Sequence, residues 1–60
     1  MVKMGTRFYD EREGRYITPD GVCTNPNVYC CIVEEDTGEG LGVVDRQLFT
    51  EYELRHFTEL

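Results

Sequence analysis

Short apolar segments rich in Val, Ile, Tyr and Phe alternate along the chain with clusters of Gly, Pro, Asn and Asp. The first composition is typical of β-strands, and the second is typical of the turns that join them. The alternation predicts two antiparallel hairpins. One is formed by residues 6–10 and 15–18, and the other by residues 28–35 and 41–48.

Four sequences carry the residue types that turns require. Pro fixes φ near the value that the second residue of a turn adopts, and Gly accepts backbone angles that other residues avoid. The expected breaks between strands are EREG (11–14), TPDG (18–21), TNPN (24–27) and DTGEG (36–40).

The most apolar run of the chain is VYCCIV, residues 28–33. Strand alternation sends Val28, Cys30 and Ile32 to one face and Tyr29, Cys31 and Val33 to the other. Both faces are then apolar, which is typical of a central strand that is covered on both sides. We therefore expect Cys30 and Cys31 to serve in packing, because cysteine is among the most buried residue types.

The segment after residue 48 changes in character. Thr50 followed three residues later by Glu53 is a capping box, and Phe49 before the cap can pack on Leu54 at the fourth helical position. These signals predict a short helix from about residue 51 to residue 55. Residues 56–58 are left open between an extension of the helix and a short closing strand.

Together these elements predict a mainly β domain that spans residues 1–60. It would have four or five short antiparallel strands and one helical turn near the C-terminus, arranged as a small, strongly bent barrel. A chain of 60 residues has only a thin margin of stability, because its core is small relative to the entropy that folding removes. So small a core leaves little room for a ligand pocket of about 300 Å³ or more, and we do not expect an enzyme.

The charge of the chain is unevenly distributed. Residues 1–33 contain four acidic and four basic residues, whereas residues 34–60 contain eight acidic residues against Arg46 and Arg55, which accounts for the whole net charge of −6. The acidic half should repel nucleic-acid phosphates and attract a basic protein surface. We therefore expect a protein partner and no direct contact with nucleic acid.

Three cysteines and one histidine match the ligand count of a Cys₃His zinc site: Cys23, Cys30, Cys31 and His56. The spacing does not match, because structural zinc sites take paired ligands two to four residues apart, whereas Cys30 and Cys31 are adjacent and point to opposite faces of a strand. We expect no metal and no cofactor, and a metal-binding domain is the least favoured interpretation. No Ser or Cys lies near His56 in sequence, so no nucleophile–base pair is predicted.

Four tyrosines and three phenylalanines are a large aromatic complement for a chain of this length. A domain this small cannot bury every ring, and an exposed ring beside carboxylates can hold an Arg or Lys side chain through a cation–π contact. The predicted binding surface combines three tyrosines with the acids of the second hairpin: Tyr9, Tyr16, Tyr52, Glu34, Glu35, Asp36 and Glu39.

Two segments carry a resemblance to a known family. RFYDEREGRYIT (7–18) is similar to the first strand and acidic loop of SH3 domains, and LFTEYELRHF (48–57) resembles their late helical turn and closing strand. The resemblance implies a five-stranded SH3-like or Tudor-like barrel. The chain has neither the Trp nor the proline-containing segment on which SH3 peptide binding normally relies, so proline-rich ligands are not implied. In overall style it also resembles short accessory proteins of bacterial mobile elements and phages.

The leading hypothesis is a non-enzymatic interaction module that presents its acidic, tyrosine-bearing surface to a basic partner. The alternative is a DNA mimic that blocks the basic site of a nucleic-acid-binding protein, which requires carboxylates spaced like phosphates along one face. No long apolar run or leader-like stretch is present, so we expect a cytoplasmic protein with no membrane contact. We expect a monomer or a weak homodimer.

Overall fold

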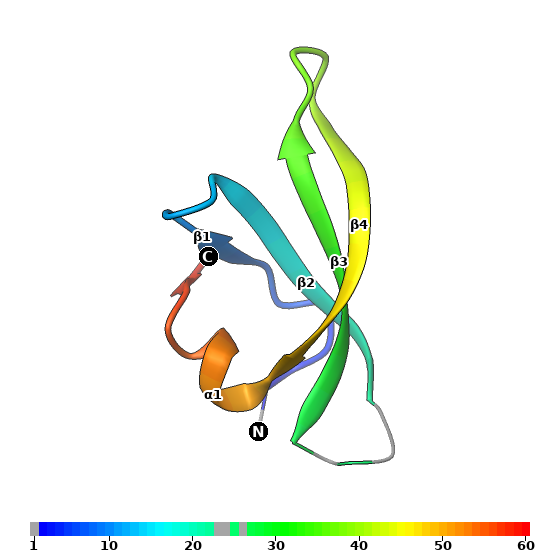
Figure 1. Ribbon diagram of the computed structural model, residues 1–60, viewed down its shortest axis with the longest axis vertical. Helices are drawn as coiled ribbons and strands as arrows, with labels where there is room; N and C mark the ends of the chain where they lie inside the picture. The colour runs from blue at the N-terminus through cyan, green and yellow to red at the C-terminus, as the bar shows by residue number, and fades with distance from the viewer. Residues whose placement is uncertain (1, 23–24, 26) are drawn as a thin grey trace.

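The computed structural model describes residues 2–22, 25 and 27–60 (Figure 1). The elements are β1 (Phe8–Asp10), β2 (Arg15–Val22), β3 (Val28–Asp36), β4 (Leu41–Thr50), α1 (Glu51–Leu54) and β5 (Thr58–Glu59). The five strands form one antiparallel sheet in the order β4-β3-β2-β1-β5. The predicted mainly β class, with one short helix near the C-terminus, is confirmed.

Both predicted hairpins are present. The first pairs Asp10 with Arg15 across the β1–β2 turn, and the second pairs Asp36 with Leu41 across the β3–β4 turn. The tip of the second hairpin extends beyond the rest of the molecule (Figure 1). With the tip included, the longest dimension of the molecule is 35 Å. Gly38 and Gly40 allow this tight turn, since their φ angles of 89° and 118° are unfavourable for residues with a side chain.

The prediction of a turn at TPDG is wrong. Residues 18–21 lie inside β2, and the register to β3 shifts between Pro19 and Gly21, so Asp20 is the extra residue of a β-bulge. A bulge tolerates proline because no ladder hydrogen bond from its nitrogen is needed there. The residue types that build turns therefore also build this bulge. The expected break at TNPN falls partly on residues 24 and 26, outside the described residues.

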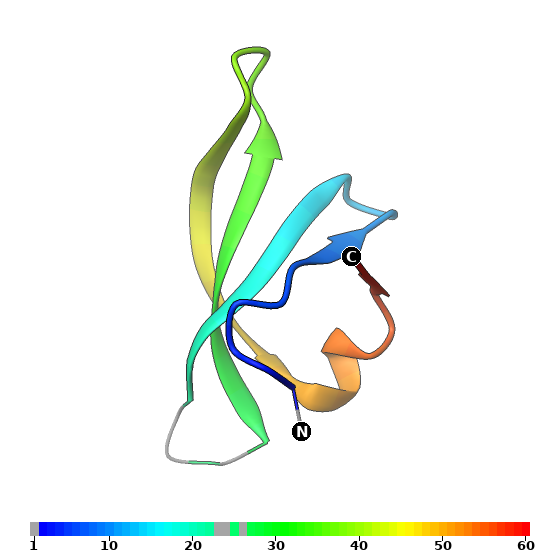
Figure 2. The same ribbon diagram turned by 180° about the vertical axis from the view of Figure 1, so that it is seen from behind.

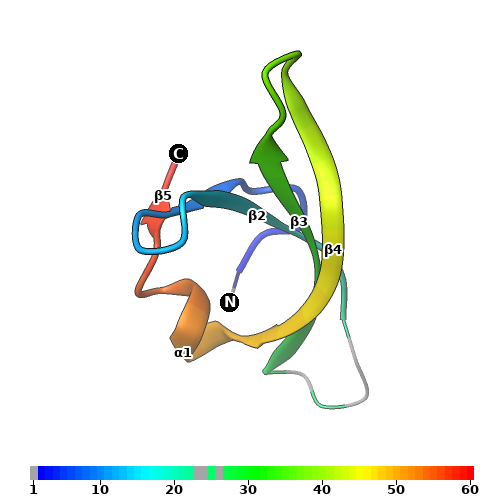
Figure 3. The same ribbon diagram turned by 45° about the horizontal axis from the view of Figure 1, so that its top comes forward.

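The core lies on the inner face of the curled sheet. Figure 3 shows the long strand β4 bending so that α1 comes round toward β1 and β5. The buried apolar side chains belong to the N-terminal segment, β1 to β4 and α1: Val2, Phe8, Ile17, Tyr29, Cys31, Val33, Phe49 and Leu54. The N-terminal segment passes between the lower end of β2 and α1 (Figure 2), where the Val2 N–H donates to Tyr29 Oη at 3.2 Å.

The expectation that β3 is covered on both faces is wrong. β3 is an inner strand of the sheet, and Tyr29, Cys31 and Val33 are buried, but Cys30 and Ile32 on the opposite face are only half-buried. Among the described residues, no helix or strand packs on that outer face. One short helix in a chain of 60 residues is enough to cover one face of the sheet and leaves the other uncovered.

The predicted capping box is confirmed. Thr50 Oγ1 accepts from the Glu53 N–H at 3.1 Å, and Glu53 Oε1 accepts from the Thr50 N–H at 2.8 Å. Phe49 and Leu54, the predicted staple residues, are both buried in the core. The helix ends at Leu54, one residue earlier than expected.

The segment after the helix returns to the sheet. Residues 58 and 59 form β5, in which Thr58 pairs with Tyr9 of β1. Of the two structures considered for residues 56–58, the closing strand is the one observed, and it begins at Thr58. α1 connects the two edge strands, β4 and β5. No pairing joins these strands within the described residues, so the sheet is bent but is not seen to close into a barrel.

The burial of Cys31 gives a direct test of the strand assignment. Cys31 is fully buried, whereas Cys30 is half-buried on the outer face. In the Cys23→Ser/Cys30→Ser double variant we expect a thiol reagent to modify Cys31 only at the rate of unfolding, because the reagent must reach the core. Mass spectrometry during labelling measures this rate. Modification of native Cys31 as fast as that of a denatured control would contradict the assignment.

Candidate functional site

An open groove lies between the β1–β2 turn and α1, and we call it the α1 groove. It encloses about 690 Å³ and is lined by Tyr9, Asp10, Glu11, Arg12, Glu13, Arg15, Phe49, Tyr52, Glu53, His56, Phe57 and Thr58. The sequence alone led us to expect no room for a site of this size. The groove exists because it lies between surface elements at the mouth of the curled sheet and takes no space from the core.

Asp10 holds one wall of the α1 groove. Its side chain is 4% exposed, and its Oδ1 accepts from the backbone N–H groups of Arg12 and Glu13 at 3.1 and 3.4 Å. Its Oδ2 accepts from Arg15 Nε at 3.0 Å. The carboxylate therefore satisfies two N–H groups of the turn and one guanidinium, which is how a buried charge becomes tolerable. Gly14, with φ of 66°, completes the turn.

The opposite wall is built from α1 and the residue pair Tyr52 and His56. The Tyr52 side chain is 75% exposed, and its ring centroid lies 4.5 Å from that of His56. His56 Nδ1 lies 2.8 Å from the Tyr52 carbonyl oxygen, which can only accept, so Nδ1 carries the proton. This hydrogen bond orients the imidazole ring beside the exposed tyrosine.

The aromatic lining of the α1 groove comes from Phe49, Phe57 and Tyr52, together with Tyr9. The rings of Phe49 and Phe57 meet edge to face, with centroids 5.7 Å apart and an interplanar angle of 82°. Phe49 is buried and Phe57 is half-buried. The Arg15 guanidinium carbon lies 5.7 Å from the Phe49 ring centroid, so the protein itself uses one cation–π contact at this place.

Acidic groups outnumber basic ones around the groove. Asp10 and Arg15 form an ion pair and neutralise each other. The other charged residues that line the groove are three acids, Glu11, Glu13 and Glu53, and one base, Arg12. All four of these remaining charged residues are exposed. An aromatic surface bordered by excess carboxylates favours a cationic ligand that carries apolar carbon atoms.

The predicted binding residues do not form one surface. Tyr9 and Tyr52 line the α1 groove. Tyr16 and Glu34 are cross-strand neighbours on the outer face of the sheet, with the Tyr16 ring centroid 4.9 Å from that of Tyr9.

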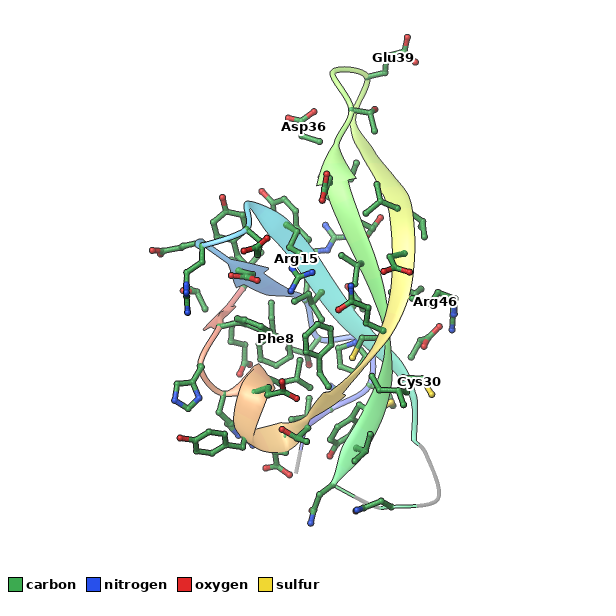
Figure 4. The ribbon with its side chains drawn as sticks, viewed as in Figure 1. Phe8, Arg15, Cys30, Asp36, Glu39 and Arg46 are labelled. Carbon is green, nitrogen blue, oxygen red and sulfur yellow. The ribbon has the colours of Figure 1, made fainter. Side chains whose placement is uncertain are left out.

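The remaining predicted residues, Glu35, Asp36 and Glu39, belong to the β3–β4 tip. Figure 4 shows Asp36 and Glu39 far from α1. Asp36 has a local structural task there. Its Oδ1 accepts from the Gly38 N–H at 2.8 Å, while the Thr37 N–H donates to the Gly40 carbonyl at 2.9 Å. Glu35 and Glu39 are exposed. The tip therefore carries carboxylates without the aromatic side chains that line the α1 groove.

Of the residues that line the groove, sequence reasoning predicts only Tyr9 and Tyr52 as binding residues. Those that it misses include Glu11, Glu13, Glu53, His56 and Phe57. The EREG sequence was interpreted only as a turn, and Glu53 only as a capping residue. The acids of the turn and those of the helix are far apart in sequence, and only the pairing of β5 with β1 brings the two segments together.

No metal centre is seen in the described part of the chain, where no three His, Cys, Asp or Glu side chains gather in a geometry that could hold an ion. Cys30 and Cys31 lie on opposite faces of β3 and His56 lines the groove, while Cys23 is outside the described residues. Within the same residues, no helix has the length and apolar character that crossing a membrane requires.

Comparison of the chain with models of protein families, with curated proteins and with solved structures finds no match. What the chain does must therefore be argued from its own residues.

The Asp10 carboxylate gives a test of how the groove wall is held. We expect Asp10→Asn to lower the free energy of unfolding by about 1.5–3 kcal/mol, because hydrogen bonds to a charged group are lost and Arg15 keeps an unpaired charge. Urea denaturation measures the change. Glu11→Gln removes an exposed charge from the same turn and should change stability by about 0.5 kcal/mol or less. Equal effects of the two substitutions would contradict a special role for Asp10.

Proposed function

We propose that this protein is a non-enzymatic interaction module that binds a basic segment of another protein in the α1 groove. The observation that carries the proposal is the juxtaposition of two aromatic side chains, the exposed Tyr52 and the half-buried Phe57, with the carboxylates of Glu13 and Glu53. An Arg or Lys side chain would place its alkyl stem and its cation against the rings and direct its hydrogen-bond donors to the acids.

Arginine suits this groove better than lysine. A guanidinium is planar and weakly hydrated, so it stacks on aromatic rings and still offers several donors at its edge. The groove already contains one such arrangement, in which Arg15 lies over the Phe49 ring while it donates to Asp10. A second guanidinium, supplied by the partner, would repeat this arrangement on the exposed side.

The acids of the hairpin tip contribute in a different way. Glu35 and Glu39 lie away from the groove and carry no aromatic neighbours that would hold a cation in place. Their charge attracts a basic partner over a distance, which raises the association rate and is screened by salt. We therefore expect binding to weaken as salt is added.

The alternative of a DNA mimic requires a row of carboxylates on one face. Strand alternation places Glu34 and Asp36 on one side of β3 and Glu35 on the other, and Glu11 and Glu13 lie on a different turn. The alternative and the resemblance to SH3-like and Tudor-like domains both stay predictions. Competition between this protein and nucleic acid for the partner would favour mimicry.

The groove is tested by titration with a synthetic peptide of alternating glycine and arginine, followed by isothermal calorimetry. We expect Tyr52→Ala to weaken binding about fivefold, which corresponds to the loss of a cation–π contact of about 1 kcal/mol. Glu13→Gln should weaken it about two- to fivefold through the lost ion pair. Tyr52 and Glu13 are exposed, so neither change should unfold the domain.

Glu39→Gln is the matched control, because it removes the same charge from the exposed hairpin tip. It should leave the dissociation constant nearly unchanged at physiological salt, where charges outside the contact are screened. If Glu39→Gln weakens binding as much as Glu13→Gln does, and Tyr52→Ala has no effect, the groove is not the binding site.

A further inference from the structure

The side of the sheet that faces away from the core has its own chemistry, and we call it the outer face. Residues directly opposite each other in an antiparallel pair share a face. By the observed register, the outer face of β2, β3 and β4 includes Tyr16, Thr18, Val28, Cys30, Ile32, Glu34, Val43, Arg46, Leu48 and Thr50, and it continues to Asp36 and Leu41 at the β3–β4 tip. In Figure 4, Arg46 points away from Phe8 and from α1.

The centre of the outer face is apolar. Val28 and Ile32 are half-buried on β3, and Leu48 and Val43 on β4 are each 62% exposed. This is the second apolar face of VYCCIV, which the fold of a single chain leaves uncovered. Large apolar side chains that gather on one face, unlike single exposed ones, indicate an interaction surface.

Two ion pairs lie on the outer face, and each spans a strand. The first crosses the apolar residues, because Arg46 lies opposite Ile32 and between Val43 and Leu48 along β4. Arg46 on β4 donates to Asp20 on β2 at 2.8 Å, so the pair crosses β3. Arg7, just before β1, lies 3.8 Å from Glu34 on β3, and its guanidinium carbon is 6.0 Å from the Tyr16 ring centroid on the strand between them. The hydrogen bond and the charge of Asp20 raise the pKa of Arg46.

The part of the outer face between Val28 and Glu34, away from the β3–β4 tip, is therefore electrically balanced. Two cations stand beside two anions here, although the chain as a whole carries a net charge of −6. Two copies of an acidic protein repel each other when the acidic tips or grooves meet. The outer face is a surface on which they can meet without that repulsion.

We propose that the outer face is the contact between two copies of this chain, packed sheet on sheet about a two-fold axis. Such an interface is self-complementary, since the same patch is used twice. Leu48, Val43 and Ile32 would bury against their equivalents, and the cation at one edge would face an anion of the second copy.

The edge of β4 is a poorer surface for self-association. Asp45 and Arg46 place charges in the middle of this edge strand, and the register to β3 shifts beside them, between Val33 and Glu34. Hydrogen bonds from Gln47 Nε2 and the Arg46 N–H lower the pKa of Asp45, which keeps it charged. Charges and bulges on edge strands oppose edge-to-edge pairing.

The proposal is tested by analytical ultracentrifugation over micromolar to millimolar concentrations. We expect wild-type protein to form dimers reversibly, and we expect Leu48→Lys to raise the dimer dissociation constant about tenfold or more, because a charge would enter the apolar centre. Leu60→Lys is the matched control. It adds the same charge at a leucine that is 65% exposed at the C-terminus, and it should leave dimerisation unchanged.

Nuclear magnetic resonance of wild-type protein provides an independent measurement. On dilution, the methyl signals of Ile32 and Leu48 should shift, while those of Leu60 and Leu54 should not. A wild-type protein that is monomeric at millimolar concentration would overturn the proposal. So would equal weakening by Leu48→Lys and Leu60→Lys, or concentration-dependent shifts confined to the hairpin tip or the α1 groove.

Discussion

A chain of 60 residues with one four-residue helix has enough structure to cover only one face of its five-stranded sheet, and the rest of the architecture follows from this constraint. The inner face closes by bending, and Leu54 of α1 and Val2 of the N-terminal segment complete the core. The mouth of the bend becomes the α1 groove. Among the described residues no further element covers the opposite face, and its apolar residues stay at the surface.

The two walls of the α1 groove are fixed by short-range hydrogen bonds, together with the packing of Phe49 and Leu54 into the core. On one side the Asp10 carboxylate accepts hydrogen bonds from two N–H groups of its turn and from the side chain of Arg15. On the other, the capping box of Thr50 and Glu53 redirects the chain out of β4. The carboxylates of Asp10 and Glu53 are both hydrogen-bonded within these structures. In the β1–β2 turn, the carboxylates that can bind a partner are therefore those of Glu11 and Glu13.

The fold was predictable where the signal is local. Strand composition gave the hairpins, and the Thr50–Glu53 spacing gave the helix. Prediction failed where local chemistry admits two structures, as at Pro19 and Gly21, which build a bulge in place of a turn. It also failed for the covering of β3, because strand alternation shows that both faces of VYCCIV are apolar but not whether a second layer exists to cover them. It failed for the candidate site because the approach of the β1–β2 turn to α1 depends on the β1–β5 pairing, which is not local in sequence.

The central claim is that the α1 groove holds a guanidinium between aromatic rings and carboxylates. Intermolecular nuclear Overhauser effects between isotope-labelled protein and the glycine–arginine peptide test it most directly. Contacts from the arginine side-chain methylenes to the ring protons of Tyr52 and Phe57 are the predicted result. Contacts confined to the β3–β4 tip or to the outer face, with none to these rings, would contradict the account.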